Sequence, residues 1–195
     1  MTAEAGELFH RLTKNGIPYR ILRRGDFLNS GEYKIYVLHP YDGFYTVSSK
    51  GDVSNQNNES LVLKIVADSS SILFTGDIEQ EAEGDLIYLL EWMKSDIIKI
   101  PHHGGRTSSS PEFIEAVHPD IAVVSSGRNN PFRHPHHGAL QRYKSAGTRI
   151  FRTDMDGAVT VKANKGHYHV QTYPDEIFNK AETWGDELGN LKLLF

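Results

Sequence analysis

Three short segments hold the residue types best suited to chemistry, and each one directly follows an apolar run. They are Thr75-Gly76-Asp77, the run Pro101-His102-His103-Gly104-Gly105, and the stretch from Gly127 to His136. In layered α/β folds, loops at one end of the strands converge on a shared crevice. We therefore expect a carboxylate and imidazoles to meet there, a donor set that suits a divalent metal. Beside a phosphate ester, such a metal polarises the phosphoryl oxygen and activates water.

Each candidate also has a purely structural interpretation. Asp77 precedes an acidic run and could serve only as the N-cap of a helix. The histidines of the second and third segments could satisfy backbone groups in their loops or lie on the surface. Ser108 belongs to a serine run before Pro111, which is typical of a helix N-terminus, although its hydroxyl could also meet a phosphate.

The histidine-rich part of the chain is locally basic. Residues 101–152 hold seven Lys or Arg against three acidic residues, and they include six of the ten histidines. The whole chain carries a net charge of −4. A protein that coats nucleic acid would be basic overall, so this focused charge favours a local site for an anionic ligand. The alternative is a solvated surface on which these residues cluster by chance.

Length and composition exclude several classes of protein. A chain of 195 residues corresponds to about one domain. The absence of cysteine excludes disulfides, thiolate zinc sites and cysteine nucleophiles, so any metal must be held by His, Asp and Glu. No apolar run approaches the ~18–20 residues that cross a bilayer, and the acidic N-terminus does not resemble a signal peptide. The default expectation is a cytoplasmic location.

Hydrophobic patterning predicts a mixed α/β class, with hairpins first and alternating strands and helices later. Residues 41–58 are expected to form a long loop, 68–71 a hairpin turn, and the tail from Pro174 an appendage. The expected helices are 7–15, 78–94, 111–117 and 137–145. The expected strands are 33–38, 60–66, 72–75, 97–100, 121–124, 149–152, 158–162 and 167–172.

An ordered set of motifs then points to a known family. In chain order they are Asn57-Asn58-Glu59-Ser60-Leu61-Val62-Leu63-Lys64, Leu73-Phe74-Thr75-Gly76-Asp77-Ile78-Glu79, Lys99-Ile100-Pro101-His102-His103-Gly104, Thr107-Ser108-Ser109-Ser110-Pro111-Glu112-Phe113, His134-Pro135 and Arg152-Thr153-Asp154-Met155-Asp156-Gly157-Ala158. Over residues 7–163 this set resembles the ComEC-type branch of the metallo-β-lactamase superfamily. The resemblance implies an αββα sandwich with one or two divalent ions and a metal-dependent hydrolase activity. Competence-protein members are thought to degrade one DNA strand during uptake.

The resemblance also implies roles for individual residues. Asp77 would bridge the metals, and one of His102 and His103 would be the last metal ligand. His134 would approach the scissile phosphate or the leaving group. We expect the substrate contacts to come from Asn58, Ser108, Arg128 and His136, the cofactor to be zinc or manganese, and the substrate to be single-stranded DNA or another phosphodiester.

Two departures from the family pattern modify this expectation. The first ligand cluster, His-x-His-x-Asp-His or His-x-Asp-x-Asp-His, does not occur in this sequence. In addition, Gln56, Asn57 and Asn58 stand where many members place a histidine. We therefore expect residues 1–172 to be a partial metallo-β-lactamase-like domain, incomplete at its N-terminal side, and 173–195 to be an appendage.

Such a domain would bind metal weakly and would depend on an N-terminal half or a second chain. In full-length competence proteins the resembling domain is attached to a membrane protein. Three functional hypotheses follow from these observations. The first is a phosphodiesterase or DNA nuclease, the second a catalytically inactive half-domain that acts as a binding or interaction module, and the third a metallohydrolase of small molecules.

Overall fold

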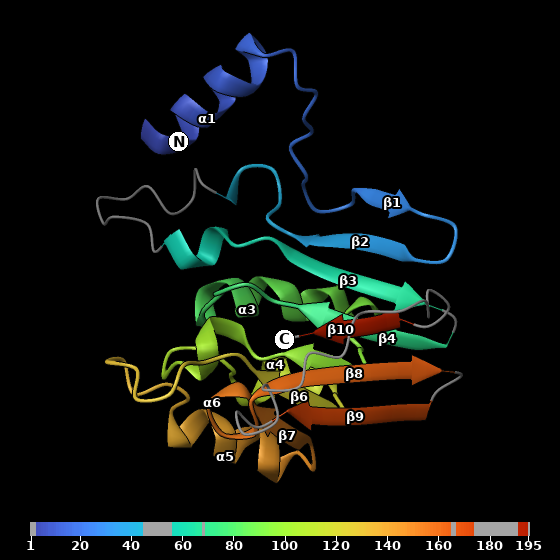
Figure 1. Ribbon diagram of the computed structural model, residues 1–195, viewed down its shortest axis with the longest axis vertical. Helices are drawn as coiled ribbons and strands as arrows, with labels where there is room; N and C mark the ends of the chain where they lie inside the picture. Colours follow the sequence, from blue (N-terminus) through green and yellow to red (C-terminus); the bar gives the residue numbers. More distant parts are fainter. Residues whose placement is uncertain (1–2, 45–55, 68, 165–166, 174–190, 195) are drawn as a thin grey trace.

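The structure is a computed structural model, which describes residues 3–44, 56–67, 69–164, 167–173 and 191–194. Within these residues the chain has a mixed α/β fold with a seven-stranded sheet, a three-stranded sheet and helices (Figure 1). The larger sheet contains β1 (Phe27–Asn29), β2 (Lys34–His39), β3 (Val62–Ala67), β4 (Ser70–Phe74), β5 (Ile97–Lys99), β6 (Ile121–Val124) and β7 (Arg149–Arg152). The sequence predicts all of these strands except β1, which has three exposed residues and therefore no buried alternation to reveal it.

The larger sheet changes from antiparallel to parallel pairing at β4. Strands β1 to β4 pair antiparallel, and β4 to β7 pair parallel, in chain order. The predicted β3–β4 hairpin is confirmed, with Ile65 opposite Ile72. Leu73, Ile98 and Ala122 form one row across β4, β5 and β6. Because parallel strands end at the same edge, the loops after β4, β5 and β6 leave the sheet on one side.

Helices cover one face of this sheet. They include α3 (Gln80–Leu86), the 3-10 helix η2 (Ile87–Trp92), α4 (Pro111–Val117) and α5 (His137–Ser145). Leu73, Ile98 and Ala122 of the strands share a core with Leu86 of α3 and Phe113 of α4, and all five side chains are fully buried. Burying a side chain of the size of leucine or phenylalanine stabilises a fold by about 1.5–3 kcal/mol, so this layer is a main source of stability.

The second sheet covers the opposite face. It consists of β8 (Ala158–Asn164), β9 (His167–Tyr173) and β10 (Leu191–Leu194), in the order β10-β8-β9. Val159 and Val161 of β8 pack against Ile72, Ile97 and Ile121, which alternate along their strands with the helix-facing residues. The described residues thus form three layers, in the order helices, seven-stranded sheet and three-stranded sheet.

The helix predicted over residues 78–94 is interrupted. Helix α3 begins at Gln80, and η2 follows it in 3-10 geometry, with Leu90 in a non-helical conformation at φ +50°. Leu86 and Met93 are buried, but Leu90 is 72% exposed. The prediction of one continuous apolar face was therefore wrong at Leu90, because a 3-10 turn has three residues and rotates the face.

The ends of the chain are described only in part. Helix α1 (Ala3–Lys14), predicted over residues 7–15, lies at one end of the molecule beyond β1 and β2 (Figure 1). Residues 45–55 of the predicted long loop and 174–190 of the predicted appendage lie outside the described residues. The division between residues 172 and 173 stays a prediction. Among the described residues, no helix is long and apolar enough to span a membrane.

Candidate functional site

The three loops that carry the candidate residues meet at one edge of the larger sheet. The first follows β4 and ends at Asp77, the second is the 3-10 helix η3 (Pro101–Gly104) after β5, and the third follows β6. Backbone hydrogen bonds join them, from His102 N to the Gly76 carbonyl (3.3 Å) and from His136 N to the Gly104 carbonyl (2.8 Å). The convergence expected from the strand order is therefore present.

Asp77 and His103 face each other across this edge. The Oδ1 atom of Asp77 lies 3.8 Å from Nε2 of His103, and both side chains are slightly under half exposed. The other ring nitrogen of His103, Nδ1, lies 2.6 Å from the Ser125 carbonyl oxygen. Since a carbonyl oxygen can only accept, Nδ1 carries the proton in the neutral ring. Nε2 then keeps its lone pair, 3.8 Å from a carboxylate oxygen, and the two groups are compatible as ligands of one cation.

The backbone conformation of η3 makes the side chains of the two adjacent histidines point in different directions. His102 and His103 have φ values of +47° and +53°, and Gly104 follows at +76°. A Cβ atom on Gly104 would lie 2.7 Å from Cβ of Pro135, so only glycine allows the second and third loops to approach this closely. The left-handed turn directs His103 toward Asp77 and His102 toward Glu79.

His102 pairs with Glu79, an acidic residue that was not among the predicted site residues. Its Nδ1 atom lies 3.2 Å from Oε1 of Glu79, without the alignment of a hydrogen bond. The same Glu79 oxygen accepts a hydrogen bond from Asn57 Nδ2 at 2.9 Å. Glu79 is also the N-cap residue of α3, so Asp77 is free of the capping role that the sequence left open. The available signal was the position of Glu79, two residues beyond Asp77 in the same loop.

His134, on the loop that follows β6, lies beside His102 and His103. Its ring centroid lies 5.4 Å from that of His102 and 6.4 Å from that of His103. The side chain of Asn130 accepts a hydrogen bond from His134 N (2.9 Å) and donates one to His134 O (2.6 Å), which fixes the residue within its loop. Burial and then the neighbouring rings of His102, His103 and His136 lower the pKa of His134. Its ring is consequently neutral near pH 7 and able to accept a proton.

The residues expected to contact substrate lie in different environments. Asn58 and Ser108 are buried, and both side chains are used within the protein. Asn58 Oδ1 accepts from Glu79 N (2.7 Å), and the Ser108 hydroxyl donates to the carbonyls of Pro101 or Gly105. Neither side chain faces solvent in this conformation. A direct role of these two residues in substrate binding stays a prediction.

Arg128 and His136 lie at the surface of the third loop. Arg128 Nε donates to the Asp154 carbonyl at 3.0 Å, and His136 Nε2 lies 3.0 Å from a guanidinium nitrogen of Arg106. Arg106 and Arg128 therefore lie exposed on the loops that follow β5 and β6. They can contribute positive charge to an anionic ligand, as the local charge of residues 101–152 suggested.

A divalent metal fits this site only in part. Asp77 and His103 are compatible as two ligands, and the Ser125 carbonyl orients the imidazole as is usual for a metal-bound histidine. However, no group of three or more His, Asp or Glu side chains among the described residues is arranged to hold a metal. Catalytic zinc usually has three protein ligands, so these two alone would bind a cation weakly.

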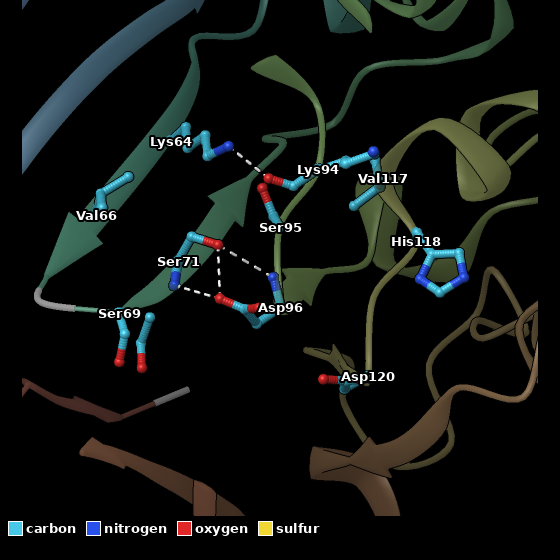
Figure 2. Close-up of a pocket in the computed structure, with 11 residues that line it drawn as sticks. Lys64, Val66, Ser69, Ser71, Lys94, Ser95, Asp96, Val117, His118 and Asp120 are labelled. Atoms are coloured by element: carbon cyan, nitrogen blue, oxygen red, sulfur yellow. Dashed lines mark hydrogen bonds between the residues drawn. The ribbon is translucent and has the colours of Figure 1, made fainter. Parts of the chain in front are cut away.

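A cavity of about 660 Å³ lies at the opposite edge of the sheet, where β4, β5 and β6 begin (Figure 2). Ser71, Asp96 and Asp120 line it, and so does Lys64 of β3. Its polar groups bind one another: Ser71 N and Oγ donate to Asp96 at 2.6 and 2.7 Å, and Lys64 Nζ donates to the Lys94 carbonyl. This cavity contains no predicted site residue, so we place the site at the loop tips.

Fold and site together define a mixed α/β domain whose loop tips gather carboxylate and imidazole side chains at one sheet edge. The chain matches no family model. It is 31% identical over 161 residues to ComE operon protein 3 of Bacillus subtilis, covering 83% of this chain and 20% of that protein.

Two further relatives are 35% identical over 118 residues. Competence protein ComA of Neisseria gonorrhoeae is matched over 60% of this chain and 17% of its own length. Recombination protein 2 of Haemophilus influenzae is matched over 59% of this chain and 14% of its own length. The chain is therefore related in part to competence proteins, and it spans about a fifth or less of the curated relatives it matches.

Proposed function

We propose that this chain supplies part of the active site of a metal-dependent phosphodiester hydrolase that acts on single-stranded DNA or a similar phosphodiester. The observation that carries the proposal is the pair formed by Asp77 and His103, with Nε2 3.8 Å from Oδ1 and Nδ1 held by the Ser125 carbonyl. The partial relationship to competence proteins supports a substrate of this class.

In this proposal Asp77 and His103 would hold zinc or manganese, and ligands from a further stretch of polypeptide would complete the coordination. When bound, such a cation would polarise a phosphoryl oxygen and lower the pKa of its water. His102 keeps Glu79 in place beside the pair through the 3.2 Å contact. His134, whose ring is neutral near pH 7, accepts a proton or donates a hydrogen bond at the phosphate.

The charged groups around the pair serve binding. Exposed Arg106 and Arg128 attract the phosphate, because a cationic edge raises the local concentration of an anion. Burial lowers the pKa of Lys99, and the charge of Asp77 partly offsets this effect.

We also propose that the three layers belong to an αββα sandwich of the metallo-β-lactamase type. The order helices, seven-stranded sheet and three-stranded sheet supports three of the four layers. A further stretch of polypeptide, in the same chain or in a second one, would then cover the smaller sheet and provide the remaining metal ligands.

The direct test is hydrolysis of bis(4-nitrophenyl) phosphate and of a labelled oligodeoxythymidylate with added Mn²⁺. Asp77→Asn and His103→Gln should each lower turnover at least about tenfold, since even outer-shell partners of metal ligands have effects of this size. His137→Gln is the matched control, because His137 is exposed at the start of α5. Wild-type turnover in Asp77→Asn would contradict the proposal.

A second candidate is a catalytically inactive module that binds DNA or a protein. The observation in its favour is that the described residues provide no group of three metal ligands. It predicts binding of the oligonucleotide with no turnover, whether or not Mn²⁺ is present. That result, with turnover still absent after the further stretch of polypeptide is supplied, would replace the hydrolase proposal for this chain.

A further inference from the structure

Phe132 is an exposed aromatic residue beside the candidate site. Its side chain is 74% exposed at the tip of the loop that follows β6. On one side its ring stacks on that of His134, with centroids 5.9 Å apart and an angle of 30° between the planes. The His134 ring in turn lies nearly parallel to that of His103, at 6.4 Å and 21°. The rings of Phe132, His134 and His103 therefore lie one after another, from the exposed loop tip to the histidine that faces Asp77.

The loop holds Phe132 in a defined position. Asn130 Nδ2 donates to the carbonyls of Gly127 (2.8 Å) and His134 (2.6 Å), and its Oδ1 accepts from His134 N (2.9 Å). Arg133 N also donates to the Asn130 carbonyl at 3.1 Å. These four bonds close the loop on both sides of the phenylalanine. An ordered aromatic ring can bind a planar ligand without first losing the freedom of a flexible loop.

The surroundings of Phe132 are cationic rather than apolar. Arg133 follows it directly, and Arg128 and Arg106 are exposed on the same edge. The adjoining residues Asn129 and Pro131 are exposed as well, so the ring does not belong to a contiguous apolar patch of the kind that docks a protein. A hollow of about 410 Å³ beside Arg128 is lined by the root of the same loop and by Thr153 and Gly157.

We propose that Phe132 is the stacking platform for one unpaired base of a single-stranded nucleic acid, whose phosphates lie along Arg128, Arg133 and Arg106. Every base has a flat face that can stack on an aromatic ring, and the arginines supply the sequence-independent attraction to the backbone. A base in a duplex has both faces covered by its neighbours, so the platform selects single strands. This inference rests on the proposed function, because it names how the substrate of that site is gripped.

The test is a binding measurement that requires no turnover. Fluorescence anisotropy reports the affinity of the full chain for a labelled oligodeoxythymidylate of about ten nucleotides, a length within the usual range of single-strand sites. A second oligonucleotide has the same phosphates but abasic sugars in place of the bases. The variants are Phe132→Ala and Phe132→Trp, with Tyr88→Ala as the matched control, since Tyr88 is 80% exposed on η2.

Phe132→Ala should weaken binding of the normal oligonucleotide at least about fivefold and leave the abasic one unchanged, because stacking requires the base. Phe132→Trp should retain or increase the affinity, and Tyr88→Ala should have no effect. An equal loss of affinity for both oligonucleotides would overturn the stacking role. It would show that Phe132 instead maintains the conformation of the loop. Wild-type affinity in Phe132→Ala would overturn it as well.

The same titration separates this inference from the proposed function. Failure of the wild-type chain to bind either oligonucleotide would overturn the nucleic-acid substrate itself, and with it the platform. Binding that does not depend on Phe132 would overturn only the platform and would leave the hydrolase proposal to the turnover assay.

Discussion

Nε2 of His103 and Oδ1 of Asp77 face each other across 3.8 Å, although the two residues come from different loops. When Nδ1 donates to the Ser125 carbonyl, Nε2 is the ring nitrogen left to bind a proton or a metal ion beside the carboxylate. Two acceptors in this arrangement are stabilised by a cation between them, either a proton or a metal ion. The proposed hydrolase chemistry therefore rests on this pair.

The first prediction concerns Gly104, which follows His103 in the left-handed turn. Gly104→Ala should lower the free energy of unfolding by at least about 1 kcal/mol, since φ of +76° is strained for alanine. The added Cβ would also lie 2.7 Å from Cβ of Pro135 and push the second and third loops apart. Urea denaturation measures the loss.

Gly84→Ala provides the matched control for this substitution. Gly84 lies inside α3, and a Cβ atom there would meet nothing within 4 Å. We expect this variant to be more stable than the wild type by about 0.5–1 kcal/mol, because alanine has the higher helix propensity. Similar effects of the two substitutions would show that the conformation of Gly104 is not required.

The second prediction concerns Glu83, a fully buried acid beneath the loop that follows η3. Its carboxylate accepts hydrogen bonds from the backbone of Ser109 and from Ser110 N, the latter at 2.8 Å. Arg142 Nε donates to the Ser109 carbonyl at 2.6 Å, so the loop is held from both sides. Glu83→Ala leaves buried N–H groups without acceptors and should cost about 1–3 kcal/mol of stability.

Denaturant unfolding of Glu83→Ala beside Glu115→Ala checks this expectation. Glu115 is exposed on α4, and its replacement should change stability by no more than about 0.5 kcal/mol. A loss for Glu83→Ala as small as that of the control would mean that the carboxylate does not hold the loop.

The third prediction is a pH dependence that arises from His39. The ring is fully buried, Nε2 lies 2.7 Å from the Asn58 carbonyl, and Nδ1 has no hydrogen-bond partner among the described residues. Burial lowers the pKa of His39 below its ordinary value of 6.5, despite the bond to Asn58. The unfolded chain then binds more protons than the folded one between the lowered pKa and 6.5.

The part of the stability that is linked to His39 is therefore fully present above pH 6.5. It is lost as the pH falls toward the lowered pKa of His39. The slope contributed by one such group is at most about 1.4 kcal/mol per pH unit. His39→Gln removes the titrating ring, so its free energy of unfolding should fall less steeply below pH 6.5. Denaturant titrations at a series of pH values compare the two slopes, and equal slopes would exclude His39 as the source.

Several elements could be predicted closely from the sequence, because local signals mark their ends. Helix α4 begins at Pro111 and α5 ends before Gly147, and both have the predicted bounds. The fully buried strand β6 was visible as an apolar run. The exposure of Leu90 was not predicted, because the periodicity assumes a continuous α-helix and the chain is in 3-10 geometry with a non-helical residue at this point.

The site was predictable as a set of loops but not as a set of contacts. Strand order brings Asp77, His102 and His103 to one edge, and this follows from parallel pairing. Which histidine faces Asp77 depends on three successive left-handed residues, a conformation that no pattern of residue types specifies. The pairing of Glu79 with His102 depends on the same turn.

Divalent-cation affinity tests the central claim most directly. Free Mn²⁺ can be followed by electron paramagnetic resonance during titration of the wild type, Asp77→Asn, His103→Gln and His102→Gln. We predict weak binding by the wild type, at least about tenfold weaker binding when Asp77 or His103 is replaced, and a smaller effect for His102. Unchanged Mn²⁺ affinity in both Asp77→Asn and His103→Gln would contradict the account.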